Sequence, residues 1–232
     1  VLTKAPIWKL LAMFSAAIML AAAPVFADET EITVGVYHFP PIASVDANGK
    51  PSGLLGDLLQ ELEQANPAVS FRVFHTSPKR RYLDFEAGLY DVIFFESPGW
   101  GWTKRNVDIS RPILADEELY VALKKPGRDD SFFDDLEQRS IVAISGYHYG
   151  FTGYETDNSV LEQKFNIEFS DSHSRNIKLI KADRPSVAEV AIVSHSYLQR
   201  HLARHPEDWD KLLVSKKPDQ RYQLSIIARK GG

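Results

Sequence analysis

The chain has 232 residues, is 44% hydrophobic and carries a formal net charge of −4. It contains no cysteine, which excludes a disulfide framework and a lipid-modified cysteine. Basic and acidic residues are interspersed along the chain, which gives no sign of a nucleic-acid surface, so we predict no nucleic-acid partner.

The first residues have the pattern of a secretory signal peptide. Lys4 and Lys9 precede an apolar run over residues 10–23, and small residues flank Phe26 where signal peptidase cleaves. A membrane anchor is the alternative, but the run is short for a full span. We therefore predict a signal peptide over residues 1–27 and a mature protein in the periplasm.

The stretch from residue 31 to 64 predicts a strand, an exposed loop and a helix. Apolar residues alternate from Ile32 to Val36, and Tyr37–Pro41 then form an aromatic and proline turn. Leucines between residues 54 and 62 follow the spacing of an amphipathic helix. An open α/β sheet presents its ligand crevice at such a position, beyond the carboxyl end of a strand.

The next elements continue the same alternation of strand and helix. A short strand at 71–74, a helix after Ser77-Pro78 and a buried strand at 91–95 predict a parallel sheet with right-handed crossovers. The remaining predicted elements are strands at 119–123, 141–144, 190–193 and 222–228, and helices at 131–136 and 175–183.

Several of these segments together resemble the family 3 extracellular solute-binding proteins, the periplasmic receptors of ABC importers. The motifs that carry the resemblance are Phe39-Pro40-Pro41, Asn48-Gly49-Lys50, Gly53–Leu58, Phe85–Val92, Val107–Pro112 and Tyr222–Gly231. The resemblance implies the α/β fold of the type II periplasmic binding proteins, with two α/β lobes joined by a two-strand hinge. It implies lobe 1 at 28–117, lobe 2 with the hinge at 118–213 and a return strand at 214–232, without the family's C-terminal helical tail.

The loop after the strand at 91–95 contains two tryptophans separated by a glycine. Trp100 and Trp102 are poor choices for an exposed connection unless something covers them. We interpret them as aromatic walls of a binding cleft, with Tyr37 and Phe39 opposite. A local aromatic cluster that closes the sheet is the alternative.

The resemblance also implies an arginine in this loop that holds the α-carboxylate of an amino acid. The family's position falls on Thr103, so a loop shift would be needed to bring Arg105 to the same place, and Arg81 is a further candidate. In the second lobe, Tyr147 lies in a glycine-containing loop. The resemblance implies that this loop starts a helix whose free amide groups meet the ligand.

Ser194 occupies the position of the aspartate that binds the ligand ammonium in the family. A neutral hydroxyl does not supply the counter-charge that a buried ammonium needs. We therefore expect a solute without a free amine, or one that is held in a different way.

No catalytic or cofactor-binding motif is visible in the sequence. His201 and His205 have a spacing that suits a metal, but no acid or cysteine cluster joins them, so we predict no metal. The sequence thus predicts a monomeric, non-catalytic protein without a cofactor, whose lobes close on a small polar or amino-acid-like solute for an inner-membrane ABC permease.

Two alternatives remain open at the level of sequence. One is an enzyme on the same scaffold, a dehydratase of a cyclic carboxylic acid with Glu96 as proton donor. The other is a ligand-free sensor or adaptor domain, which would have a cleft filled by side chains.

Overall fold

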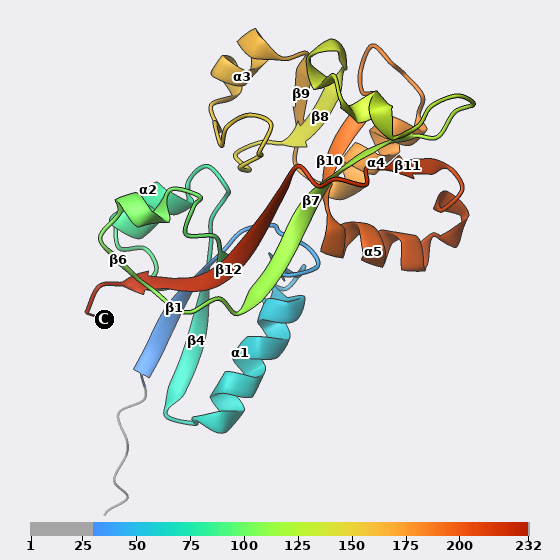
Figure 1. The fold of residues 1–232 in the computed structure, drawn as a ribbon. Coiled ribbons are helices and arrows are strands. Elements are labelled where there is room, and N and C mark those ends of the chain that lie inside the picture. Colours follow the sequence, from blue (N-terminus) through green and yellow to red (C-terminus); the bar gives the residue numbers. More distant parts are fainter. Residues whose placement is uncertain (1–29, 232) are drawn as a thin grey trace, which may run out of the picture.

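The structure is a computed structural model that describes residues 30–231, and the predicted signal peptide lies outside these residues. The described chain forms two α/β lobes whose strands follow one another in the order β4-β1-β5-β12-β7-β10-β8-β9 (Figure 1). The predicted two-lobed fold is confirmed. Within residues 30–231, no helix combines the length and the apolar composition that a membrane span needs.

The first lobe is a parallel sheet extended by antiparallel strands. β1 (Thr30–Val36) pairs in parallel with β4 (Val69–His75) and β5 (Val92–Glu96), while β6 (Val107–Ile109) pairs with a later strand. The crossovers carry α1 (Leu54–Ala65) and α2 (Arg81–Glu86). A small hairpin of β2 (Ser44–Val45) and β3 (Pro51–Ser52) lies between β1 and α1.

Two long strands connect the lobes. The first half of β7 (Leu114–Leu123) pairs with the first half of β12 (Gln220–Arg229) in antiparallel register. The second half of β12 continues into the first lobe against β5 and β6, whereas the second half of β7 continues into the second lobe (Figure 1). Because few strands cross between the lobes, these two form the natural hinge.

The second lobe surrounds the far end of β7. Its strands are β8 (Ile141–Ile144), β9 (Ile167–Ser170), β10 (Val190–Ser194) and β11 (Leu212–Val214), and its helices are α3 (Asn158–Lys164), α4 (His173–Lys181) and α5 (His195–Arg204). Short 3₁₀ turns lie at η2 (Trp102–Lys104), η3 (Asp130–Phe133), η4 (Leu136–Gln138) and η5 (Pro206–Asp208).

The helix predicted at 131–136 is wrong. The segment forms two separate 3₁₀ turns, and the carboxylate of Asp129, rather than the hydroxyl of Ser131, receives the capping hydrogen bond. Short polar side chains bond to their own backbone in turns, which competes with a continuous helix. The apolar stripe of α1 is confirmed in part, because Leu55 and Leu59 are buried while Leu54 and Leu62 at its edges are exposed.

Candidate functional site

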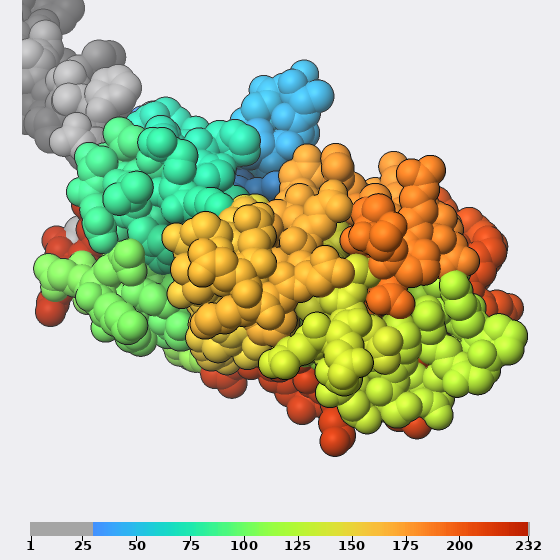
Figure 2. All heavy atoms as spheres, turned by 90° about the horizontal axis from the view of Figure 1, so that it is seen from above, coloured from blue at the N-terminus to red at the C-terminus, as the bar shows by residue number. Residues whose placement is uncertain are grey.

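The candidate site is the seam between the lobes, beyond the carboxyl ends of β1, β5 and β8. The space at its centre has a volume of only about 10 Å³, roughly the minimum for one water molecule. The second lobe (yellow to orange) lies directly against the first (cyan to green) in Figure 2. The side chains around the central space are Tyr37, Phe39, Arg81, Trp100, Glu118, Tyr147 and His148.

Aromatic rings from both lobes close the seam. The Tyr147 hydroxyl of the second lobe donates to the His38 carbonyl of the first at 2.8 Å. The Tyr147 ring meets the edge of Phe39 at 5.9 Å between centroids, and the rings of Trp100 and His148 are stacked at 6.0 Å. The lobes are therefore closed on each other, and these rings occupy the centre of the cleft.

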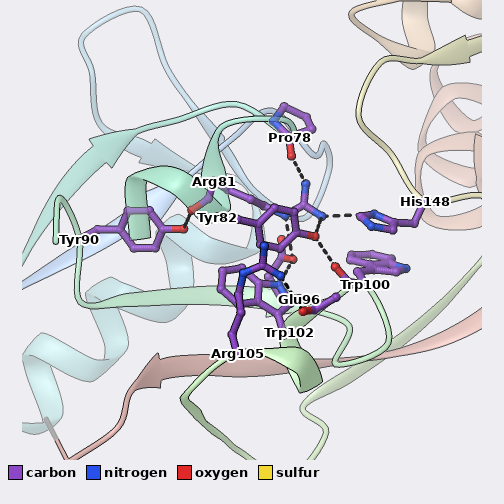
Figure 3. Close-up of polar contacts among 10 residues, drawn as sticks. Pro78, Arg81, Tyr82, Tyr90, Glu96, Trp100, Trp102, Arg105 and His148 are labelled. Atoms are coloured by element: carbon purple, nitrogen blue, oxygen red, sulfur yellow. Dashed lines mark hydrogen bonds and ion pairs between the residues drawn. The ribbon is translucent and has the colours of Figure 1, made fainter. Parts of the chain in front are cut away.

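A buried ion pair anchors the first-lobe side of the seam. Arg81 is 1% exposed, and its Nε lies 3.0 Å from an oxygen of Glu96, which is completely buried (Figure 3). The same oxygen accepts from the indole N–H of Trp102, and the remaining arginine donors reach the Pro78 carbonyl and the Tyr82 hydroxyl. Glu96 is thus held as a hydrogen-bond acceptor, which gives no support to a role as proton donor.

This buried charge pair shifts the titration of its neighbours. Burial and the nearby Glu96 carboxylate raise the pKa of Tyr37 well above its usual range. Burial, followed by the positive charges of Arg81 and Arg105, lowers the pKa of His148 to about 3. His148 is therefore neutral near pH 7, and its Nδ1 accepts from Arg81 at 3.4 Å.

The structure brings five of the eight predicted site residues together around the central space: Tyr37, Phe39, Arg81, Trp100 and Tyr147. Trp102 lies behind them, completely buried, and supports Glu96. Arg105 points elsewhere, because it donates to Glu86 at 3.0 Å and to the Gly101 carbonyl at 2.7 Å. The loop shift that would bring it into the cleft is absent from this arrangement. Ser194 is buried at the end of β10.

The expectation that the glycine-containing loop after β8 leads directly into a helix is wrong. The loop continues without a helix until α3 begins at Asn158. The amide groups of Gly150 and Phe151, at 2.6 and 2.7 Å, donate to the carboxylate of Asp219. The chain itself therefore supplies the anion at this position, and these amides are not free for a ligand.

Glu118 is a cleft residue that sequence reasoning did not identify. It lies on the hinge strand β7, is 2% exposed and lines the central space. Burial, followed by the charge of Asp116, raises the pKa of its carboxyl well above its usual range. Acids at 116–118 are typical of an exposed strand end, so only their position just before the apolar residues 119–122 indicates burial.

A wider groove between the lobes lies away from the seam's centre. A groove of about 460 Å³ runs between the loop at residues 40–53 and the helices α4 and α5. His201 and Lys181 on this groove both contact the buried carboxylate of Asp208, at 2.8 and 2.7 Å. No group of three possible metal ligands occurs within the described part of the chain, residues 30–231.

We expect the stability of the protein to fall as the pH decreases, partly because of His173. Its ring is completely buried between Tyr147 and Tyr197, and burial lowers its pKa to about 3. The unfolded chain binds a proton at this residue below about pH 6.5, whereas the folded chain does not. This contribution is complete above pH 6.5 and is lost as the pH falls towards 3.

Urea unfolding at pH 7 and pH 5 measures this effect. From pH 7 to 5, His173 alone should lower the free energy of unfolding by about 2 kcal/mol. The variant His173→Phe should show a correspondingly smaller decrease, since all other titrating groups are common to both proteins. Parallel pH profiles for the two proteins would show that His173 is not held neutral by the fold.

Comparison with solved structures defines the class of fold. No protein-family model matches the chain, and no curated protein matches it in sequence. The chain has the α/β fold of type II periplasmic binding proteins, with two lobes and a two-strand hinge.

The structural neighbours include ABC substrate-binding proteins with amino acids bound. A substrate-binding protein of an ABC uptake transporter from Streptococcus pneumoniae, with bound histidine, has a TM-score of 0.66 and 16% identity over 86% of this chain and 80% of its own. A binding component of an ABC transporter from Wolinella succinogenes, complexed with lysine, has a TM-score of 0.66 and 16% identity over 87% and 83%. The arginine-bound form of truncated ArgBP from T. maritima has a TM-score of 0.64 and 18% identity over 88% and 90%.

Proposed function

We propose that this protein is the periplasmic, non-catalytic solute-binding component of an ABC importer. The observation that carries the proposal is the pair of lobes, joined by β7 and β12, that meet on a seam lined by aromatic rings. Hinge movement at these strands opens the seam to admit a small polar or amino-acid-like solute. Closure then presents both lobes in the arrangement that an inner-membrane permease recognises, with the protein acting as a monomer.

The proposed lobes keep the boundaries expected from the sequence, 28–117 and 118–213, with the return strand in 214–232. Five predicted residues serve as the proposed solute contacts: Tyr37, Phe39, Arg81, Trp100 and Tyr147. Trp102 and Arg105 support them from behind, Trp102 through Glu96 and Arg105 through a cation–π contact at 4.1 Å with Tyr82.

A thermal-shift screen of amino acids and small polar solutes tests this function. A solute that binds only the folded protein stabilises it by about 2.7 kcal/mol at a concentration of 100 times its Kd. We expect Trp100→Ala to abolish this stabilisation, because Trp100 is 6% exposed and lines the central space. Trp209→Ala is the matched control, since Trp209 is 57% exposed and lies outside the seam. Equal responses of both variants would contradict the proposed site.

A ligand-free sensor or adaptor domain is the second candidate function. The observation that favours it is the central space of about 10 Å³, which side chains already fill. Such a domain would stay closed in solution without a solute and would gain no stability from any compound in the screen. Solute-dependent stabilisation therefore decides between the two functions.

A further inference from the structure

The central space of the seam contains one buried acid, Glu118, that no basic side chain balances. Glu118 is 2% exposed, and on β7 it lies opposite Ser194 of β10 and Gln220 of β12. One of its carboxylate oxygens accepts from the Tyr222 hydroxyl at 3.2 Å. Its other oxygen has no hydrogen-bond partner among residues 30–231. A buried carboxylate in this situation is costly unless a cation or a proton reaches it.

The charged groups nearby do not provide that cation. Arg81 lines the same space but is already paired with Glu96, and no basic side chain in the described range lies within 4.0 Å of Glu118. The other groups that raise its pKa are also acids, Asp116 and Asp219. Of the buried ionisable groups of the site, Arg81 and Glu96 pair with each other, and Glu118 is left without a basic partner.

The rings around Glu118 suit a positively charged guest as well. Phe39 lies 5.9 Å from Tyr147 and 6.3 Å from Trp100 between ring centroids. The faces of such rings attract cations, most strongly where water is excluded. An anion would instead meet the carboxylate of Glu118, because the guanidinium of Arg81 is already engaged.

From these observations, and resting on the proposed function, we infer that the solute is a monocation and that Glu118 is its counter-charge. The solute enters when the lobes separate, and its positive group then lies between the Glu118 carboxylate and the aromatic rings. Ser194, at the end of β10, has no carboxylate to bind a positive group. Glu118, on the hinge strand β7, supplies that carboxylate instead. The ligand class is a small organic cation, such as an amine or a guanidine.

Pairs of compounds that differ in one charge test this inference on the full mature protein. Calorimetric titrations compare L-arginine with L-citrulline and L-lysine with L-norleucine, and n-butylamine and choline add monocations of other shapes. We expect at least one of the cations to bind. If that cation is arginine or lysine, it should bind at least tenfold more tightly than its neutral counterpart. Tenfold corresponds to about 1.4 kcal/mol.

The variant Glu118→Gln removes the charge with almost no change of shape. We expect its unfolding midpoint to rise without solute, because the cost of burying an ionisable carboxyl is removed, while cation binding weakens at least tenfold. A higher midpoint with weaker binding also shows that the variant folds. Glu117→Gln is the matched control, because it removes one negative charge from the neighbouring residue, whose carboxylate pairs with Arg221 at 2.9 Å. This control should bind cations as the wild type does.

The possible outcomes separate the inference from the function on which it rests. Equal binding of neutral and cationic partners, or cation binding that Glu118→Gln leaves unchanged, would overturn the role of Glu118 and leave solute capture intact. Binding of only neutral or anionic compounds from the wider screen would do the same. No binding of any compound would overturn both proposals.

Discussion

Replacing Arg81 with methionine is expected to lower the free energy of unfolding by about 3–5 kcal/mol. In the wild type, Arg81 and Trp102 both donate to the buried carboxylate of Glu96. The substitution removes the arginine and leaves the Trp102 indole to donate to this carboxylate alone. It also removes the arginine that holds the Pro78 carbonyl and the Tyr82 hydroxyl. Urea unfolding, monitored by tryptophan fluorescence, measures the loss.

A double variant separates the lost ion pair from the lost packing. Arg81→Met combined with Glu96→Gln should recover a large part of the stability, because the uncompensated charge is then absent. Arg80→Met is the matched control on the neighbouring residue. Its side chain is 69% exposed and its guanidinium pairs with Asp84 at 3.0 Å, so we expect a loss below about 1 kcal/mol. Similar losses for Arg81→Met and Arg80→Met would contradict a central role for the buried pair.

Replacing Gly146 with alanine is expected to shift the protein from the closed towards an open arrangement. Gly146 lies in the second lobe and packs directly on the first. A methyl group there would lie 2.7 Å from Cγ of Lys79, 3.0 Å from the Lys79 backbone nitrogen and 3.1 Å from Cβ of Pro78. The lysine side chain is able to move, but the backbone nitrogen and the proline are not. Separation of the lobes relieves these contacts, so the penalty falls on the closed form alone.

Gly153→Ala provides the control for backbone strain. Gly146 has φ = 81° and Gly153 has φ = 65°, so alanine at either position costs about 1–2 kcal/mol in the left-handed region. No atom lies within 4 Å of a methyl group built on Gly153. Gly146→Ala should cost about a further 1–3 kcal/mol in the closed form, the usual cost of overpacking.

Small-angle X-ray scattering on both variants measures the outcome. The radius of gyration of Gly146→Ala should exceed that of the wild type, and that of Gly153→Ala should not. An unchanged radius for Gly146→Ala would mean that the lobes accommodate the methyl group without opening.

Local patterns in the sequence were sufficient to predict a parallel α/β sheet, and the family resemblance added the two lobes. Alternating apolar residues, the leucine stripe of α1 and the order of strands and helices indicated parallel sheets with crossovers, as the structure confirms. Periodicity determines which face of an element is buried, and this depends on residues a few positions apart. The same patterns failed at residues 131–136, where polar side chains bond to their own backbone and only short turns form.

The roles of the charged residues depended on tertiary structure. Arg105 and Arg81 are both arginines near the aromatic loop, yet only Arg81 reaches the central space. Asp219 accepts hydrogen bonds from the amides of the loop after β8, although it lies 69 residues after Gly150 in the chain. Glu118 is buried because β12 and β10 pair on either side of it. The sequence by itself determined most of the strands and helices and the rings that line the cleft. Charge partners come from distant segments, so the packing of the two lobes decided which charged groups are paired and which acid has no basic partner.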